Sequence, residues 1–186
     1  MSNLHPLFPR VVYEESDLLL HELENYKDFF LKTTTFDSSP LLNVPSTHKT
    51  FDQFHTCNEL QELVKVICQN VCNFTTQLGY SYDDIADLRL QNMWVNVSEQ
   101  GSYIFPHIHS QSFISGVFYI ECDSDDELIF FNNPNDVLDR RPSNKNDATH
   151  SFKCTPGKLL LFKSNLLHGT PAQKSQRKIA VSFNLV

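Results

Sequence analysis

The chain has 186 residues, the length of one ordinary domain and enough to bury a hydrophobic core. Its formal net charge of -7, without any run of lysines or arginines, argues against binding to a nucleic-acid backbone. No apolar stretch approaches the roughly 20 residues that a membrane-spanning helix needs. We therefore expect an ordered globular protein whose partners are neither nucleic acids nor membranes.

The N-terminal sequence and the cysteines both bear on location. The first ten residues, MSNLHPLFPR, lack the charged start and apolar core of a secretion signal. Five cysteines are an odd number, and their spacing is not that of a disulfide framework, so they are expected to be reduced thiols. Both observations favour a cytoplasmic location.

The first half of the chain combines one predicted strand with two predicted helices. Residues 7–13 predict an opening strand. Ser16 is a candidate N-cap for a helix whose apolar residues repeat at three- and four-residue steps over 18–30. A second amphipathic helix is predicted over 58–78. Residues 33–55, which are rich in threonine, serine and proline, predict a loop that wraps the body.

From residue 87 the pattern changes to short β runs separated by turns. Seven or eight strands are predicted in about a hundred residues, and such a series is typical of a sandwich or jelly roll. We expect one domain, residues 1–186, in which residues 1–86 are a helical support and residues 87–186 are the β core. The polar segment 132–150 has almost no apolar residues, and we interpret it as a candidate lid.

Two histidines, His107 and His109, lie one residue apart between two predicted strands. In extended backbone, side chains repeat with a period of two, so both imidazoles can face the same side. His168 follows near the end of the chain, and Arg177 lies nine positions later. Neutral imidazole is a good ligand for divalent iron, and three ligands on one face leave positions for substrate and dioxygen. The spacing predicts a metal site of these three histidines. The remaining histidines lack this context and are expected at the surface: His5, His21, His48, His55 and His150.

Several spaced motifs in the second half resemble the iron(II)- and 2-oxoglutarate-dependent oxygenase superfamily. The residues that carry the resemblance are WVN, PHIH, SGVFYI, PGKLLLF and RKIAVSFN. They are similar to a group of small oxygenases, many from bacteria and phages, with an H-x-H, an S-G-V-x-Y strand, a P-G-x-L-x-x-F turn and a terminal R-x-x-x-S-F-N. The similarity covers about residues 90–186. It implies a mainly β fold, a double-stranded β-helix of the jelly-roll or cupin-like kind with the N-terminal helices packed outside.

The resemblance also implies where the site residues lie. The first ligand motif would end the second core strand, the last histidine would lie on the seventh, and the co-substrate arginine on the eighth. His107 and His168 would bind iron, and the planar guanidinium of Arg177 would pair with the distal carboxylate of 2-oxoglutarate. If Arg177 points into the barrel, residues 179, 181 and 183 share its face. Further hydrogen bonds to the bound acid are expected from four polar residues, each of which is equally a candidate for ordinary barrel lining: Asn96, Tyr103, Ser115 and Tyr119.

One position departs from the widespread His-x-Asp/Glu pattern of the superfamily. His109 stands where that pattern has its acid. Three outcomes stay open: His109 binds the metal, or it stands back while water completes the site, or the site takes another metal or is inactive. We favour His109 as a ligand, because alternate positions of an extended segment face the same side.

The activity implied by the resemblance is that of a non-haem Fe(II)- and 2-oxoglutarate-dependent dioxygenase. It would use O2 to hydroxylate a substrate that the sequence does not identify. By analogy with relatives, the expected substrate is a protein or peptide side chain such as that of proline. Two alternatives stay open: a three-histidine cupin-type dioxygenase without 2-oxoglutarate, and a non-catalytic β-helix structural module. The expected partners are the small-molecule co-substrate and the unknown prime substrate, and a homodimer is left open. The expected cytoplasm is that of a bacterium or of a phage-infected host cell.

Overall fold

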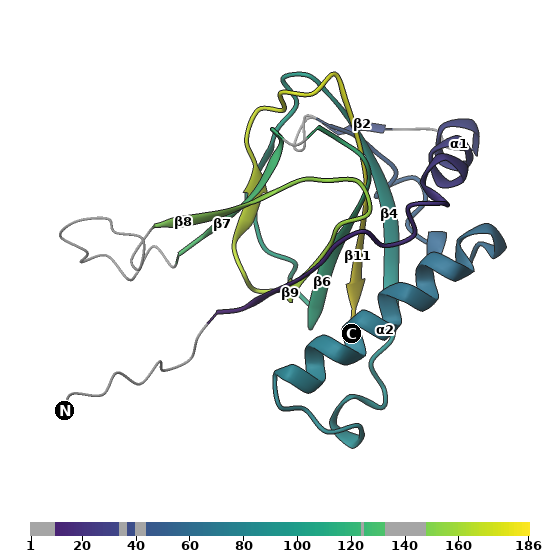
Figure 1. Cartoon of the computed structure of the whole chain (residues 1–186). Coiled ribbons are helices and arrows are strands. Elements are labelled where there is room, and N and C mark those ends of the chain that lie inside the picture. Colours follow the sequence, from purple (N-terminus) through teal and green to yellow (C-terminus); the bar gives the residue numbers. More distant parts are fainter. Residues whose placement is uncertain (1–9, 34–36, 40–43, 124, 133–147) are drawn as a thin grey trace.

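Two antiparallel sheets face each other in the computed structural model, which describes residues 10–33, 37–39, 44–123, 125–132 and 148–186 (Figure 1). The larger sheet has the strand order β1-β9-β6-β11-β4-β3-β2, and the smaller has the order β5-β10-β7-β8. The strands are β1 (Val12–Glu15), β2 (Asp37–Ser39), β3 (Val44–Ser46), β4 (Leu90–Glu99), β5 (Ile104–His107), β6 (Ile114–Glu121), β7 (Glu127–Phe131), β8 (Thr149–Lys153), β9 (Leu159–Lys163), β10 (His168–Thr170) and β11 (Arg177–Leu185).

The eight strands from β4 to β11 form a double-stranded β-helix. Their number agrees with the seven or eight strands predicted after residue 87. His107 ends β5, the second of the eight, and His168 begins β10, the seventh. The strand that the resemblance assigns to the co-substrate residue is the eighth, β11. The expected fold class and the expected order of the motifs along the strands are therefore confirmed.

The helices α1 (Leu23–Thr33) and α2 (Gln61–Gln77) cover the outer face of the larger sheet (Figure 1). Three short 3-10 helices accompany them, at Phe54–Thr56, Asn58–Leu60 and Asp83–Ile85. The apolar residues of α2 recur at three- and four-residue steps and are buried against the sheet, as the pattern predicted. No helix within the described ranges is both long enough and apolar enough to cross a membrane.

The first helix begins later than the sequence pattern predicts. A helix was expected from Ser16, but α1 starts at Leu23. The backbone N–H of Leu18 donates to the carbonyl of Gly157 at 2.9 Å, and Asp17 and Leu19 have φ angles of 59° and 52°. Left-handed residues cannot continue a right-handed helix, so this tertiary contact overrides the apolar periodicity.

Two other expectations from the first half need correction. The opening strand was expected over residues 7–13; β1 runs from Val12 to Glu15 and pairs with β9, and residues 1–9 lie outside the described part. Residues 33–55 were expected to form a loop, but β2 and β3 belong to this segment and extend the larger sheet. Of the candidate lid, residues 133–147 lie outside the described residues, and its last two residues begin β8.

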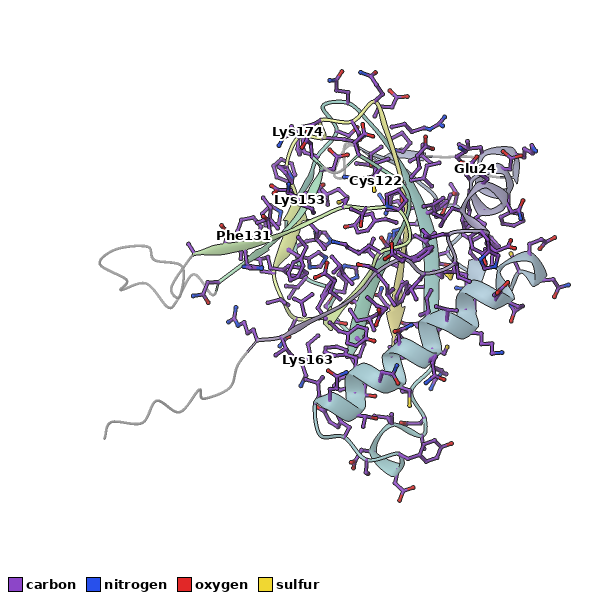
Figure 2. All side chains as sticks on the ribbon, in the orientation of Figure 1. Glu24, Cys122, Phe131, Lys153, Lys163 and Lys174 are labelled. Atoms are coloured by element: carbon purple, nitrogen blue, oxygen red, sulfur yellow. The ribbon has the colours of Figure 1, made fainter. Side chains whose placement is uncertain are left out.

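Side chains fill the space on both sides of the larger sheet (Figure 2). Lys163, at the end of β9, donates to the hydroxyl of Tyr80 at 3.1 Å and also lies over the rings of Tyr80 and Phe113. Tyr80 follows α2 in the chain, so these contacts fix the end of that helix to the sheet.

Both faces of β11 are buried, but against different partners. Ile179, Val181 and Phe183 are fully buried in the core between the sheet and the helices. The alternate residues 178, 180, 182 and 184 face the interior between the two sheets, where they line a cavity. The pleat of this single strand therefore separates the structural core from the candidate site.

Gly116 in β6 is required by the packing of the helix-side core. A Cβ atom built at this position would meet the Phe183 ring at 2.4 Å and a methyl group of Leu161 at 2.7 Å. We predict that Gly116→Ala lowers the free energy of unfolding by about 1–3 kcal/mol, because the overpacked core must shift. Urea unfolding, followed by circular dichroism, measures this change. Unchanged stability would show that Phe183 moves aside without cost.

Candidate functional site

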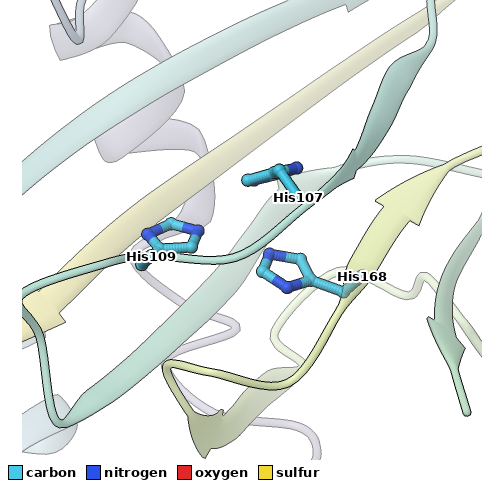
Figure 3. Close-up of side chains that lie close together, drawn as sticks. All are labelled: His107, His109 and His168. Atoms are coloured by element: carbon cyan, nitrogen blue, oxygen red, sulfur yellow. The ribbon is translucent and has the colours of Figure 1, made fainter. Parts of the chain in front are cut away.

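Three histidine rings converge between the two sheets (Figure 3). His107 lies at the end of β5, His109 in the loop that follows, and His168 at the start of β10. His107 and His168 are direct cross-strand partners, and their ring centroids are 4.5 Å apart. One ring nitrogen from each of the three histidines lies within 4.8 Å of the others. This arrangement is the one that the spacing predicted, and its nitrogen atoms are close enough to share one cation.

Backbone carbonyls set the orientation of two of the rings. Nδ1 of His107 lies 2.8 Å from the carbonyl oxygen of Phe105, and Nδ1 of His168 lies 2.8 Å from that of Leu166. A proton on each Nδ1 donates to the carbonyl, which leaves Nε2 as the unprotonated nitrogen that a metal ion needs. In both histidines, the contact with the carbonyl two residues earlier thus selects the tautomer that is protonated on Nδ1.

The electrostatics of the site keep two of the rings neutral. Burial, followed by the neighbouring His107, lowers the pKa of His168 to about 3. The same two causes in the same order lower the pKa of His109 to about 4. Both imidazoles are therefore uncharged at neutral pH, as ligands must be.

His109 is held by a buried polar network. Its backbone N–H donates to the Ser164 carbonyl at 2.9 Å, and its ring is hydrogen-bonded to the Asn184 side chain. Asn184 accepts a hydrogen bond from Ser115 at 2.7 Å and donates to Asn92 at 2.9 Å. The network fixes the third ring in position, although His109 lies in a loop and not in a strand.

The three histidines line a cavity of about 630 Å³ between the sheets. Its lining includes residues of β4, β6 and β11 and, outside these strands, His48, Asp52, Gln53 and residues 108–112. Apart from histidines, only two of the described lining residues carry a charge, Lys178 and Asp52. The wall that β11 contributes is mostly polar, whereas Phe162 of β9 and Leu128 of β7 are apolar, so the cavity is mixed in character.

Lys178 lies on the cavity face of β11 and is 5 % exposed. No side-chain hydrogen bond or ion pair of Lys178 is present among the described residues. The carboxylate of Asp126 acts on it electrostatically, but this group already accepts hydrogen bonds from Ser175 and from the backbone of Lys174. A buried ammonium without a close anion is unfavourable, so Lys178 is suited to bind a negatively charged group in the cavity.

The expectation that Arg177 points into the barrel is wrong. Arg177 lies on the opposite face of β11, where its Nε and Nη2 donate to the carboxylate of Glu121 at 3.0 and 2.9 Å. It shares this face with Ile179, as the alternation required, but the shared face is the one that the helices cover. Glu24 and Lys27 of α1 are its electrostatic neighbours. The structure therefore does not bring Arg177 to the histidines.

The motif spacing contains a signal for the basic residue on the cavity face. In the R-x-x-x-S-F-N pattern that the closing strand resembles, three residues separate the basic residue from the serine. Counting back from Ser182 gives Lys178, whereas Arg177 is one position too far. Arginine and lysine are adjacent here, and apolar residues occur on both faces of the strand. The alternation pattern therefore did not show which of the two basic residues faces the cavity.

The four expected hydrogen-bonding residues divide into two pairs. Asn96 and Tyr119 line the cavity. Ser115 belongs to the buried network behind His109, and Tyr103 packs against Phe105 at the surface, with ring centroids 5.0 Å apart. Neither Ser115 nor Tyr103 is among the described lining residues. The structure therefore places only two of these four residues, Asn96 and Tyr119, where they could contact a bound acid.

Asn96 presents an unsatisfied acceptor to the site. Its Nδ2 donates to Ser182 at 3.1 Å, whereas its Oδ1 is buried without a hydrogen-bond partner among the described residues. Tyr119 is fully buried, and burial raises the pKa of its hydroxyl well above 10. Both residues therefore offer neutral hydrogen-bonding groups, and Oδ1 of Asn96 still lacks a partner among the described residues.

His48 and Trp94 were not predicted as site residues, yet both line the cavity. The ring of Trp94 lies between His48, at 4.4 Å, and His109, at 5.9 Å between centroids. His48 follows β3, which pairs with β4 in the larger sheet, and this pairing brings it to the histidines. No local pattern around residue 48 indicates this long-range contact.

The fold and the site define a class of protein: a double-stranded β-helix that carries three converging histidines and a buried basic residue. A family model described as "Putative 2OG-Fe(II) oxygenase" matches residues 92–184, which is half of the chain. The chain belongs to this family and is an enzyme, a 2-oxoglutarate- and Fe(II)-dependent oxygenase. Its cofactor is iron, and its co-substrates are 2-oxoglutarate and O2. No match was found among curated proteins.

Solved structures of similar fold share little sequence with the chain. An oxidoreductase of the 2OG-Fe(II) oxygenase family from Burkholderia pseudomallei has a TM-score of 0.65 at 10% identity, over 94% of this chain and 84% of that one. The viral collagen prolyl hydroxylase from Paramecium Bursaria Chlorella virus-1, in complex with 2OG, has a TM-score of 0.60 at 13% identity, over 94% of each chain. A Pseudomonas putida prolyl-4-hydroxylase has a TM-score of 0.62 at 10% identity, over 94% and 92%. At such identities the likeness shows the fold.

Proposed function

We propose that this oxygenase hydroxylates a C–H bond of an organic substrate, with Fe(II) held by His107, His109 and His168 and with 2-oxoglutarate held by Lys178. The observation that carries the proposal is the convergence of the three imidazoles on the wall of the cavity that also contains the ammonium of Lys178. The donor set fits ferrous iron, because neutral imidazoles with fixed tautomers are suitable ligands for this metal. Lys178 fits a dicarboxylate, because the lysine is buried and lacks an ion pair among described residues.

His109 takes the third ligand position in this proposal. Its ring is as close to the other two as they are to each other, within about 0.7 Å in centroid separation. The Asn184 hydrogen bond fixes the ring, as hydrogen-bonded neighbours of metal ligands commonly do. No carboxylate among the described residues replaces it in the three-histidine cluster. The protein ligands are then all neutral, so the anionic co-substrate supplies the negative charge at the metal.

When bound, Fe(II) with 2-oxoglutarate and dioxygen supplies the oxidation that turns C–H into C–OH, while 2-oxoglutarate becomes succinate and carbon dioxide. The chain's own residues position the reactants. Lys178 pairs with the distal carboxylate of 2-oxoglutarate, and the free Oδ1 of Asn96 accepts a hydrogen bond inside the cavity. Phe162 and Leu128 keep part of the wall apolar and limit access of water.

A protein or peptide side chain, such as that of proline, is the substrate class that the similar structures support. Two of them are described as prolyl hydroxylases, one viral and one from Pseudomonas putida. The alternative without 2-oxoglutarate leaves the buried ammonium of Lys178 unexplained. The alternative of a non-catalytic module leaves the shared orientation of the three rings unexplained, and membership of the family speaks against it.

Anaerobic titration tests the proposed function. We predict that Fe(II) and 2-oxoglutarate together give a visible charge-transfer absorption that neither gives alone, because the acid chelates the bound metal. Subsequent exposure to air is expected to yield succinate in stoichiometric amounts. Absence of both the absorption and the succinate, in protein that binds Fe(II), would reject 2-oxoglutarate as the co-substrate of this site.

Adjacent basic residues provide a matched pair of variants for the co-substrate contact. We predict that Lys178→Ala weakens 2-oxoglutarate binding by roughly 30-fold or more, since a buried carboxylate loses its charge partner. Arg177→Ala should leave this affinity unchanged and cost less than about 1 kcal/mol of stability, because it breaks a partly exposed ion pair. Titration of the charge-transfer absorption measures both affinities. A larger loss of affinity in Arg177→Ala would restore the arginine as the co-substrate residue.

Substitution of His109 separates the three outcomes that the sequence left open. We predict that His109→Ala weakens Fe(II) binding at least about tenfold and that His109→Asp retains binding, because a carboxylate can take the same position. Ser110→Ala, which changes the next residue of the cavity rim, is the control. Calorimetric titration with Fe(II) under anaerobic conditions measures the affinities. Wild-type affinity in His109→Ala would mean that water, and not this histidine, completes the site.

A further inference from the structure

The end of the cavity farthest from Lys178 has a different chemistry from the rest. Primary amides dominate this end, and it also contains the carboxylate of Asp52, the one acidic side chain among the described lining residues. The amides come from five residues: Gln53, Gln91, Asn92, Gln111 and Asn184. No lysine or arginine among the described residues lines this end. It is therefore equipped to hold hydrogen-bonding groups and one positive charge, and it is poorly equipped to hold an anion.

The register of the larger sheet separates Lys178 from Asp52 along the cavity. Lys178 pairs with Ser98 of β4, whereas the segment of Asp52 joins β4 at Met93. Five residues of an extended strand separate these two positions, which corresponds to roughly 17 Å. Trp94, whose ring stacks against His109, lies next to Met93. His109 consequently lies closer to the segment of Asp52 than to Lys178.

Backbone contacts hold Asp52 at this end of the cavity. The N–H of Met93 donates to the Asp52 carbonyl at 2.7 Å, and the buried Phe54 anchors the 3-10 helix that follows. The carboxylate accepts a hydrogen bond from the Gln53 side chain at 2.9 Å. Asp52 also acts electrostatically on His48, whose ring contacts Trp94. The Asp52 carboxylate is thus a fixed part of the cavity wall. The rings of His48 and Trp94 connect it to His109.

We propose that Asp52 and the surrounding amides form the prime-substrate subsite and that they select a substrate with a positively charged amine or guanidinium. The proposal rests on the proposed function, because it assigns the Lys178 end to 2-oxoglutarate and leaves the Asp52 end to the second substrate. In a protein or peptide substrate the charge belongs to a basic residue at or next to the hydroxylated position. In a small substrate it belongs to a free amine. The chain's net charge of -7 favours the approach of either.

Binding of matched probes tests this subsite without requiring turnover. The probes are the Nα-acetyl amides of lysine, arginine, norleucine and glutamate, together with a lysine-containing peptide and free spermidine. Binding to the full chain is measured anaerobically by calorimetry, with Fe(II) and 2-oxoglutarate present and, separately, without them. Trp94 is the only tryptophan of the chain, and its fluorescence is a second readout next to the subsite.

We predict that the lysine and arginine probes bind at least about tenfold more tightly than the norleucine probe, since a charge-assisted hydrogen bond replaces an apolar contact. Asp52→Asn should remove this preference, and Asp52→Lys should transfer it to the glutamate probe. Asp87→Asn, which removes an exposed carboxylate outside the cavity, is the control and should leave it unchanged. The peptide and spermidine then show whether the charge comes from a polypeptide or from a free amine.

Three results would overturn the proposal: no preference for the cationic probes, a preference for glutamate in the wild-type protein, or an equal loss in Asp52→Asn and Asp87→Asn. In air, a cationic probe that binds should also raise the rate of succinate formation. A normal charge-transfer absorption without any cationic preference would reject the subsite alone. A cationic preference without that absorption would reject the proposed co-substrate and leave the subsite in place.

Discussion

The pleat of β11 is the constraint on which the site depends. Because this strand is buried on both faces, its odd-numbered residues build the core against the helices and its even-numbered residues build the cavity wall. If the register of β11 shifted by one residue, Arg177 would replace Lys178 on the cavity wall. The same shift would remove Ile179, Val181 and Phe183 from the core. The packing of three large apolar side chains thereby fixes the position of one lysine. Stability and the placement of Lys178 in the cavity wall are consequences of the same register.

The metal centre depends on local geometry more than on the strands themselves. His107 and His168 are cross-strand partners, but their ring nitrogens are made available by carbonyl oxygens two residues earlier in the chain. His109 lies outside any strand, and the Ser115–Asn184 network takes the place of a sheet. Burial keeps the rings of His109 and His168 neutral, so these two can bind a cation without first losing protons. In the proposed site all three protein ligands are neutral, so the anionic co-substrate is the natural source of negative charge at the metal.

The sequence was sufficient for the fold class, the strand order of the motifs and the convergence of the three histidines. The fold class and the strand order of the motifs came from the resemblance to a known family, whereas the shared side of His107 and His109 followed from period-two alternation, which is local. It was insufficient where long-range contacts decide. Leu18 bonds to Gly157 and delays the first helix, and strand pairing brings His48 to Trp94. The expectation that Arg177 points into the barrel failed for another reason: alternation identifies two faces of a strand, and when both are buried it does not say which one is the site.

The proposed co-substrate contact and part of the proposed substrate subsite come from different kinds of structure. His168 and Lys178 belong to core strands, whose register the packing enforces. Asp52 and the amides of residues 53 and 111 belong to segments between strands, which touch the sheet through a few backbone contacts. Substitutions in those segments disturb little of the core. In the proposed arrangement, the charge at one end of the cavity can therefore change while the metal and its co-substrate keep their places.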